Sequence, residues 1–313
     1  MDYLTGMKKL SALFSLLRIS ALFFTERNIF KTAANAKSLL WQITGNGLKQ
    51  PSYFLGTMHL MCAEDAALSS NAEKIIAQVN AVYLEVDITN AGELLNEMLD
   101  TGMKGERSLG DILSAADYNK VKMFFQEHEG NMPFEILEKQ PPLLISSTLY
   151  ELLLPCKQKH GVELKIIEEA CKAKKEIKGL ETFEFQSSIL ESIPYEAQAA
   201  DLVSTIANLE KYRKKLADMI AVYKAQDIDK LYELSVDEET ATAAYMDMLL
   251  YKRNSNWIAQ FQSIAENGST LFAVGAGHLG GEKGVISLLR QQGYMVRPIS
   301  NPSAPKLLLG HIY

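Results

Sequence analysis

Short runs of apolar residues predict β-strands near both ends of the chain. Residues 39–44 alternate loosely between apolar and polar side chains, and a glycine-containing turn leads to a second β-like run, which favours a hairpin. Residues 81–86 are apolar apart from Glu85, as expected of a buried strand. The runs that predict strands are 39–44, 52–55, 81–86, 176–179, 270–274 and 294–299.

Helical spacing of apolar residues dominates the middle of the chain and is interrupted mainly at glycines and prolines. The segments that predict helices are 71–79, 92–153, 161–172, 182–265 and 284–292. Because strands cluster at both ends, we predict an α/β (α+β) fold with a central mixed sheet built from both ends of the chain. A large helical insertion, around residues 92–265, is expected to cover one side of that sheet.

The first 36 residues differ from the rest of the chain. A basic start, a short apolar stretch and Ala34-Asn35-Ala36 are the three parts of a secretory signal, although Arg18 splits the apolar run. We therefore predict a signal peptide or leader at 1–36, with an amphipathic leader as the alternative, and one domain over 37–313. The protein would be exported to the periplasm or medium if the leader is cleaved, and cytoplasmic otherwise. No later segment has the 18 or more apolar residues needed to span a bilayer.

Composition narrows the possible classes of protein. The 313 residues are 47% hydrophobic and 22% charged, which is typical of a packed globular protein and excludes a disordered or fibrous one. The formal net charge is −6, so the chain lacks the excess of basic residues that is typical of nucleic-acid-binding proteins. Three cysteines cannot form a disulfide framework. We expect Cys62 to be a small buried thiol, whereas Cys156 and Cys171 could pair in an exported protein.

Two glycine–histidine turns are the strongest chemical signal. Gly56 and Gly275 each follow a predicted strand, and a histidine comes three residues later, at His59 and His278. Loops at the carboxyl ends of parallel strands converge on one crevice, so these two of the five histidines could meet in space. Imidazole serves there as a metal ligand or as a general base near neutral pH.

The second turn also matches a competing motif. Gly275, Gly277 and Gly280 form GxGxxG, the dinucleotide-binding fingerprint, between a predicted strand and a predicted helix. The next strand carries no acidic residue for a ribose, and only 33 residues follow Gly280. We therefore expect no nucleotide cofactor, although an anion at this turn is physically reasonable.

Two charged residues stand in apolar surroundings. Glu85 lies inside a predicted strand, where a charge is costly unless it is paired. It either reaches solvent at the strand end or faces the same edge of the sheet as His59. Arg253 lies in an otherwise apolar helix and suits a carboxylate or an oxyanion, the alternative being a structural ion pair with Glu181. Two histidines and one carboxylate are a common set of ligands for catalytic zinc, and manganese or cobalt fit the same donors.

Five sequence blocks occur in a characteristic order. They are Gly-Thr-Met-His, Leu-Glu-Val-Asp, Gly-Leu-Glu-Thr, Lys-Arg-Asn and Val-Gly-Ala-Gly-His-Leu-x-Gly. In this order they resemble the TraB/GumN family, which includes the TIKI proteases and is distantly similar to erythromycin esterases and ChaN-like proteins. The resemblance covers about residues 38–300, so that 37–313 would be a single TraB/GumN-like hydrolase domain.

The resemblance implies roles only at matching positions. The expected catalytic residues are His59, Glu85, Arg253 and His278, and the expected metal ligands are His59, Glu85 and His278. The expected substrate-binding residues are Gly56, Glu181, Asn254, Gly275 and Gly277. TIKI-like members are regarded as divalent-metal-dependent peptidases, whereas the esterase relatives use a similar set without a required metal.

We therefore predict a peptidase-like hydrolase that uses zinc, manganese or cobalt and acts on a peptide or small acyl substrate. A metal-free esterase with the same residues is the first alternative. A non-catalytic protein that binds or sequesters a peptide is the second alternative, because the resemblance also implies this role, in which some family members are regarded as acting by binding peptide. No nucleic-acid partner is expected, and the oligomeric state is left open.

Overall fold

A computed structural model of the chain describes residues 37–89, 102–128, 133–236 and 241–302. The leader predicted at 1–36 lies outside the described residues and stays a prediction. The described residues from Ser38 onward form one compact unit. Among the described residues, no helix combines the length and the apolar character needed to cross a membrane.

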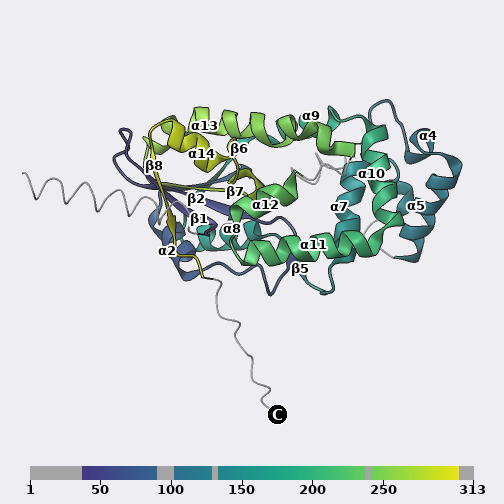
Figure 1. The fold of residues 1–313 in the computed structure, drawn as a ribbon, viewed down its shortest axis with the longest axis horizontal. Helices are drawn as coiled ribbons and strands as arrows, with labels where there is room; N and C mark the ends of the chain where they lie inside the picture. Colours follow the sequence, from purple (N-terminus) through teal and green to yellow (C-terminus); the bar gives the residue numbers. More distant parts are fainter. Residues whose placement is uncertain (1–36, 90–101, 129–132, 237–240, 303–313) are drawn as a thin grey trace, which may run out of the picture. The chain divides into compact units, whose positions relative to one another are not determined.

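A mixed sheet of six strands is the centre of this unit (Figure 1). Its order is β6-β4-β7-β2-β1-β8. The bounds are β1 Leu40–Thr44, β2 Ser52–Thr57, β4 Ala81–Val86, β6 Glu176–Glu181, β7 Thr270–Gly275 and β8 Met295–Ile299. Strands β6, β4, β7 and β2 are parallel, whereas β1 is antiparallel to both β2 and β8. The predicted α/β fold, with a mixed sheet built from both ends of the chain, is confirmed.

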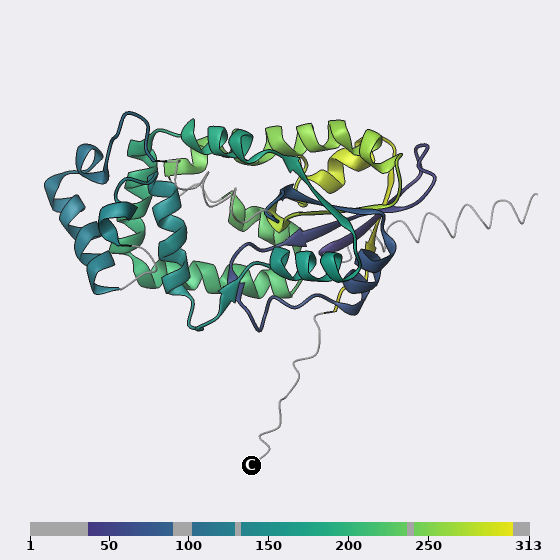
Figure 2. The ribbon, with the colours of Figure 1, turned by 180° about the vertical axis from the view of Figure 1, so that it is seen from behind.

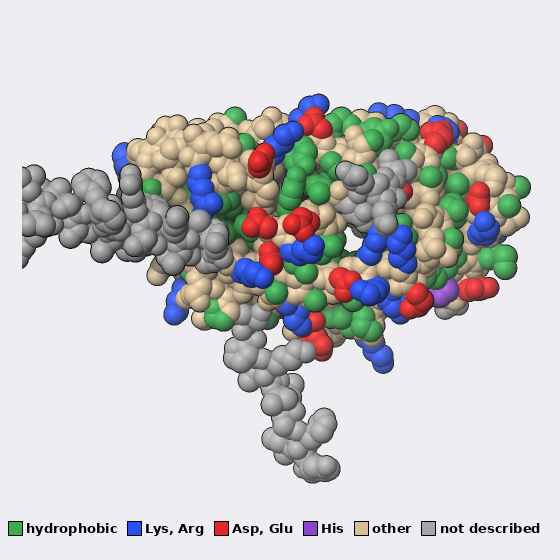
Figure 3. Space-filling model, in the orientation of Figure 1, with side chains coloured by type: hydrophobic (Ala, Val, Ile, Leu, Met, Phe, Trp, Pro, Cys, Tyr) green, Lys and Arg blue, Asp and Glu red, His purple; other side chains and the backbone are tan. Residues whose placement is uncertain are grey.

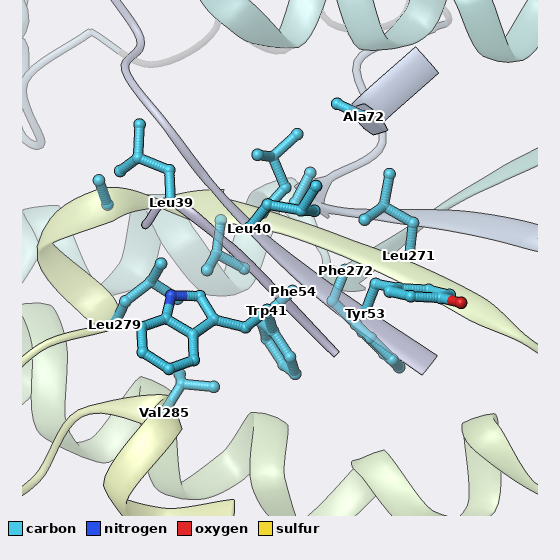
Figure 4. Close-up of a cluster of buried hydrophobic side chains, with 14 of the residues drawn as sticks. Leu39, Leu40, Trp41, Tyr53, Phe54, Ala72, Leu271, Phe272, Leu279 and Val285 are labelled. Atoms are coloured by element: carbon cyan, nitrogen blue, oxygen red, sulfur yellow. The ribbon is translucent and has the colours of Figure 1, made fainter. Parts of the chain in front are cut away.

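Helices cover both faces of the sheet, more than the one side expected from the sequence. Helices α2 (Ser70–Gln78) and α8 (Val162–Lys172) lie on one face, and α13 (Lys252–Ala265) and α14 (Val285–Gln291) lie on the other (Figures 1 and 2). Strands covered on both faces are mostly apolar, and every residue of β2 is buried. In the core, the rings of Phe54 and Phe272 stack with their centroids 4.9 Å apart (Figure 4).

A second hydrophobic cluster lies among helices of the predicted insertion. They are α4 (Leu109–Ile112), α5 (Ala115–Glu127), α6 (Phe134–Leu137), α7 (Pro142–Leu153), α10 (Tyr195–Ala207) and α11 (Leu209–Lys224). Helix α11 contributes Tyr212 to this cluster and Tyr223 to the core around the sheet. The segment 92–265 also supplies β6 to the sheet, where the run 176–179 predicted a strand, and α8 and α13 to its cover.

The remaining elements connect these layers. They are β3 (Met61–Cys62), β5 (Lys159–His160), α9 (Phe183–Glu191), α12 (Ile228–Ser235), a 3₁₀ turn at Ala241–Tyr245, a π-helical turn at Asp247–Tyr251 and a 3₁₀ turn at Ala276–His278. Acidic and basic side chains are interspersed on the face drawn in Figure 3.

The cysteine predictions were wrong. Cys62 and Cys156 form a disulfide, with their Cα atoms 5.8 Å apart, whereas Cys171 is free and exposed. The antiparallel pairing of β3 with β5, in which Cys62 faces Lys159, brings the two sulfurs together. The bond joins residues 94 positions apart, and the spacing of cysteines in a sequence does not reveal such a contact. It ties the turn that carries His59 to the segment that leads into α8.

Candidate functional site

The carboxyl ends of the four parallel strands bring most of the predicted site residues to one edge of the sheet. His59 follows β2, Glu85 lies near the end of β4, Glu181 ends β6, and His278 closes the short 3₁₀ turn after β7. This edge is where parallel sheets bind ligands. The Nε2 atoms of His59 and His278 are each 3.9 Å from Oε1 of Glu85.

Glu85 is the centre of a polar network. Its side chain is buried, so the alternative in which it reaches solvent at the strand end is wrong. Oε1 accepts a hydrogen bond from the backbone N–H of Gly275 at 2.7 Å. Oε2 accepts from Nη2 of Arg253 at 2.5 Å and from Nε2 of Gln186 at 3.3 Å. The buried carboxylate is thus compensated by one positive charge and two further donors.

The surroundings of Glu85 favour its ionised form. Burial alone would raise the pKa of Glu85, but His278, His59, Arg253 and the Gly275 N–H lower it to about 2. Arg253 and His59, whose pKa is about 9, are the partners that are positively charged near neutral pH, whereas burial lowers the pKa of His278 to about 3. Glu85 is therefore a carboxylate and His278 a neutral imidazole near neutral pH.

Asn254 fixes the tautomer of His278. The Nδ1 atom of His278 is 2.7 Å from Oδ1 of Asn254, whose Nδ2 donates to the carbonyl of Lys283 at 2.9 Å. Since the amide oxygen can only accept, Nδ1 carries the proton. The lone pair on Nε2 therefore faces the site, where Nη1 of Arg253 donates to it at 3.3 Å.

Glu163 orients the ring of His59 through a corresponding hydrogen bond. Nδ1 of His59 donates to Oε1 of this carboxylate at 2.7 Å, so Nε2 is the atom that faces Glu85. Burial would lower the pKa of His59, but the hydrogen bond and charge of Glu163, with the charge of Glu85, raise it to about 9. The His59 side chain is 66% exposed, so solvent screens these charges in part and the ring is open to a ligand.

Glu163 was missed by the sequence analysis. It lies in the first turn of α8, 104 residues from His59. Acidic residues are common at that place in any helix, because they complement the helix dipole. Only the fold distinguishes this carboxylate from an ordinary one.

Arg253 forms the ion pair that the sequence analysis kept as an alternative. Its Nε donates to both carboxylate oxygens of Glu181, at 3.2 and 3.0 Å, and its Nη2 reaches Oε2 at 2.8 Å. Nη1 also donates to the carbonyl of Leu249 in the π-helical turn before α13. The guanidinium lies 4.9 Å from the centroid of the Trp257 ring. Each nitrogen of Arg253 is thus engaged by the protein, and the group organises the site.

The three glycines that we expected to bind substrate, Gly56, Gly275 and Gly277, have different surroundings. A Cβ atom on Gly275 would lie 3.2 Å from Oε1 of Glu85 and 3.3 Å from Nε2 of His59, so the missing side chain keeps the space between them open. On Gly56 a Cβ would lie 2.8 Å from Leu279, and on Gly277 it would lie 2.6 Å from Oγ of Ser235. These two glycines permit close packing, and their contact with substrate stays a prediction.

The third glycine of the GxGxxG segment, Gly280, also permits close packing. A Cβ on Gly280 would lie 2.4 Å from the carbonyl oxygen of Ile228 in α12. Strand β8 is separated from β7 by β2 and β1, whereas a dinucleotide fold would place the next strand beside it. The topology argues against the dinucleotide interpretation.

The residues fit a divalent ion in donor chemistry and direction. Two imidazole nitrogens, with their Nδ1 atoms held by Glu163 and Asn254, face one carboxylate oxygen across the space beside Gly275. Such partners behind the ligands are typical of metal-bound histidines. The separations of 3.9 Å exceed the roughly 3.4 Å between ligands in a tetrahedral zinc shell. Within the described part of the chain, no three His, Cys, Asp or Glu side chains are as closely spaced as a metal site requires.

Comparison with known proteins gives a family and several relatives. The model of the TraB/PrgY/gumN family matches residues 39–298. The zebrafish (Danio rerio) "Metalloprotease TIKI2" is 22% identical over an alignment of 312 positions, which covers 83% of this chain and 60% of that protein. The human "Metalloprotease TIKI1" is 24% identical over an alignment of 333 positions, which covers 86% of this chain and 64% of that protein.

A shorter match is to the "Metalloprotease TIKI homolog" of the sponge Amphimedon queenslandica, which is 30% identical over an alignment of 123 positions that covers 34% of this chain and 24% of that protein. The chain thus spans about three fifths of the length of the vertebrate relatives it matches. No solved structure matches the chain.

Proposed function

Since the chain belongs to the TraB/PrgY/gumN family, we propose that it is a divalent-metal-dependent hydrolase with peptidase-like activity. The observation that carries the proposal is the convergence of the His59 and His278 Nε2 atoms on Oε1 of Glu85. The names of the relatives, which are metalloproteases, support the same class of reaction.

His59, Glu85 and His278 would hold the ion, as two imidazoles and one carboxylate do in many catalytic zinc sites. When bound, a zinc, manganese or cobalt ion polarises a carbonyl and makes a bound water more acidic. The chain's own residues prepare this site. Asn254 and Glu163 hold the two rings so that Nε2 faces inward.

Arg253 and Glu181 would position Glu85 rather than contact the ion. Arg253 holds Oε2 of Glu85, which leaves Oε1 directed between the two histidines. Glu181, whose side chain is only 3% exposed, fixes the guanidinium from the other side. The exposed edge of His59 is where a peptide or small acyl substrate would approach the site.

A metal-free hydrolase is the second candidate, favoured by the contact of Arg253 with His278. Nη1 of Arg253 occupies the lone pair that a metal would use. The raised pKa of His59 also suits a group that donates a proton to a leaving amine or alcohol. In this alternative Arg253 would stabilise negative charge on the attacked carbonyl.

Metal content separates the two candidates. The purified protein is compared with His59→Ala, His278→Ala and the control His128→Ala, which removes an exposed histidine at the end of α5. Metal dependence predicts near-stoichiometric zinc, manganese or cobalt in wild type and control, lost in both site variants. It also predicts that a chelator stops cleavage of a fluorogenic peptide library. No bound metal and undiminished hydrolysis in chelator would overturn metal dependence in favour of the second candidate.

We also propose that the protein is exported. The three-part pattern of residues 1–36 supports this. The disulfide between Cys62 and Cys156 adds support, because disulfides persist in oxidising compartments. Mass spectrometry of the mature N-terminus and of the cell fraction that holds it tests the proposal. An intact leader on a cytoplasmic protein would contradict it.

A further inference from the structure

An apolar cavity of about 420 Å³ lies between α7 and α9. This volume is within the range of pockets that bind small ligands, roughly 300–1,000 Å³. The cavity is lined mainly by apolar side chains from both helices, together with serines, the amide of Gln186 and the carboxylate of Glu191. Among the lining residues are Leu143, Leu144, Tyr150, Phe183, Gln186 and Leu190.

Helix α9 directs one face at this cavity. Phe183, Gln186, Ser187, Leu190 and Glu191 line it, and their spacing of three and four residues places them on the same side of the helix. None of the residues of α9 is fully buried, and Leu190 is 38% exposed. The helix therefore presents apolar side chains to a space that the described protein leaves open.

A buried amide holds the two walls of the cavity in place. Gln198, which is only 1% exposed, accepts a hydrogen bond from the N–H of Leu143 at the start of α7. Its Nε2 donates to the carbonyls of Leu190 and Ile193, at the end of α9 and just beyond it. One side chain from α10 thus fixes the spacing between α7 and α9, so the cavity is formed before anything binds.

Gln186 connects the cavity to the candidate site. It lines the cavity, and its Nε2 donates to Oε2 of Glu85 at 3.3 Å. Helix α9 begins two residues after Glu181, the partner of Arg253. The apolar cavity therefore adjoins the cluster of His59, His278 and Glu85, and Gln186 borders both.

We propose that this cavity is the specificity pocket of the hydrolase, which takes an aliphatic or aromatic side chain of the substrate peptide beside the bond that is cleaved. The inference rests on the proposed function and adds the substrate class. The apolar lining selects leucine- or phenylalanine-like side chains, because an acidic side chain would lose its hydration there without a charged partner. Gln186 lies where the pocket meets the reacting groups.

Two neighbouring serines on α9 give a matched test. Ser187 lines the cavity, whereas Ser188 is exposed and is not among the lining residues. Ser187→Trp fills the pocket, and Ser188→Trp adds the same side chain outside it. Ser147→Trp fills the pocket from α7 and replaces the first variant if that one fails to fold. Circular dichroism and thermal unfolding verify that the variants are folded.

Binding is measured first, without reference to activity, using the uncharged fluorophore N-phenyl-1-naphthylamine as the probe. We expect the Kd of wild type to rise at least tenfold in Ser187→Trp and to stay the same in Ser188→Trp. A blocked tetrapeptide with one leucine should displace the probe at least ten times more effectively than the same peptide with aspartate. Equal binding by both tryptophan variants, or equal displacement by both peptides, would overturn the pocket.

Cleavage is measured second, on a peptide mixture analysed by mass spectrometry. We expect cuts beside leucine or phenylalanine, with kcat/KM at these sites at least tenfold lower in Ser187→Trp than in Ser188→Trp. Cleavage that ignores the neighbouring side chain in all variants would overturn the pocket and leave the proposed function intact. Selective binding of the probe and leucine peptide, with no peptide cleaved under any metal condition, would overturn the proposed function and support the pocket as a binding site for apolar side chains.

Discussion

His59 and Glu163 are hydrogen-bonded with 2.7 Å between Nδ1 and Oε1, although 104 residues separate them in the sequence. His278 forms the corresponding bond with the amide of Asn254, also at 2.7 Å. The two histidines thus share one geometry and differ in the charge of the acceptor. The carboxylate raises the pKa of exposed His59, whereas burial beside a neutral amide lowers that of His278. The site therefore holds one imidazole that gains a proton readily and one that resists it.

Replacing Glu163 by glutamine tests this asymmetry. The variant keeps a hydrogen-bond acceptor for His59 but loses the negative charge, so the pKa of His59 should fall by about one unit or more. An NMR titration of the His59 ring in metal-free protein measures the change. Glu168→Gln removes an exposed carboxylate from the same helix and should leave the pKa of His59 unchanged. Equal titration curves for wild type and Glu163→Gln would contradict the assigned role.

The same pKa shifts predict how the stability of the metal-free protein depends on pH. His278 and Glu85 have lowered pKa values in the fold, about 3 and about 2. Their contributions are complete above the unfolded values of 6.5 and 4.5, respectively, and are lost as the pH falls toward 3 and 2. His59 has a raised pKa, so its contribution is complete below 6.5 and is lost as the pH rises through about 9.

The free energy of unfolding should therefore be greatest near pH 6.5 and fall on both sides. Urea unfolding between pH 4 and pH 10, in the presence of chelator, measures the profile. His59→Ala should remove most of the decline above pH 6.5 and keep the acid decline. If the free energy of unfolding declines above pH 6.5 to the same extent in His59→Ala as in wild type, other groups cause that decline.

Arg253 gives a test of the buried ion network. Arg253→Met leaves the buried carboxylates of Glu85 and Glu181 without their positive partner, which should cost about 3–5 kcal/mol of stability. Adding Glu181→Gln should recover part of this loss, because one of the unpaired charges is removed. Arg213→Met breaks an exposed pair with Glu210 and should cost less than about 1 kcal/mol. Equal effects of Arg253→Met and Arg213→Met in urea unfolding would contradict the network.

The disulfide provides a further prediction. Replacing Cys62 and Cys156 together by serine should lower the free energy of unfolding by about 2–4 kcal/mol under oxidising conditions. Cys171→Ser should have little effect, since this thiol is free and exposed. Peptide mapping without reductant identifies the linked cysteines directly. A Cys156–Cys171 peptide, or no linked peptide, would show that the β3–β5 contact does not hold Cys62 beside Cys156.

The sequence was sufficient to predict those features that depend on local pattern. Apolar runs predicted the strands, and Gly56 and Gly275 marked the turns that carry His59 and His278, because strand periodicity and tight turns leave local signals. A charge inside an apolar strand marked Glu85 as a candidate, but the sequence left open whether its side chain reaches solvent or faces the same edge as His59.

The supporting contacts could not be predicted in this way. The contacts of Glu163, Gln186 and Cys62 are set by the pairing of β3 with β5 and by where α8 and α9 begin relative to the carboxyl ends of the strands. These contacts join segments about 100 residues apart, and no local pattern distinguishes their residues from ordinary surface side chains. The sequence also left open whether Arg253 pairs with Glu181, which depends on the distance between β6 and α13.

Gly275 offers the sharpest test of where an ion would sit. Its backbone has φ −50°, which alanine adopts without strain, so Gly275→Ala should fold once Glu85 and His59 yield by a few tenths of an ångström. The added methyl group would stand 3.2 Å from Oε1 of Glu85 and 3.3 Å from Nε2 of His59, in the space where an ion would be held. We therefore expect the Kd for zinc or manganese, measured by calorimetry, to rise at least tenfold.

Gly277→Ala is the control with the opposite pattern, because its methyl group meets Ser235, 2.6 Å away, outside that space. It should lower the unfolding temperature and leave metal affinity within about twofold of wild type. Wild-type metal affinity in a folded Gly275→Ala protein would mean that the ion is not held between His59, Glu85 and His278.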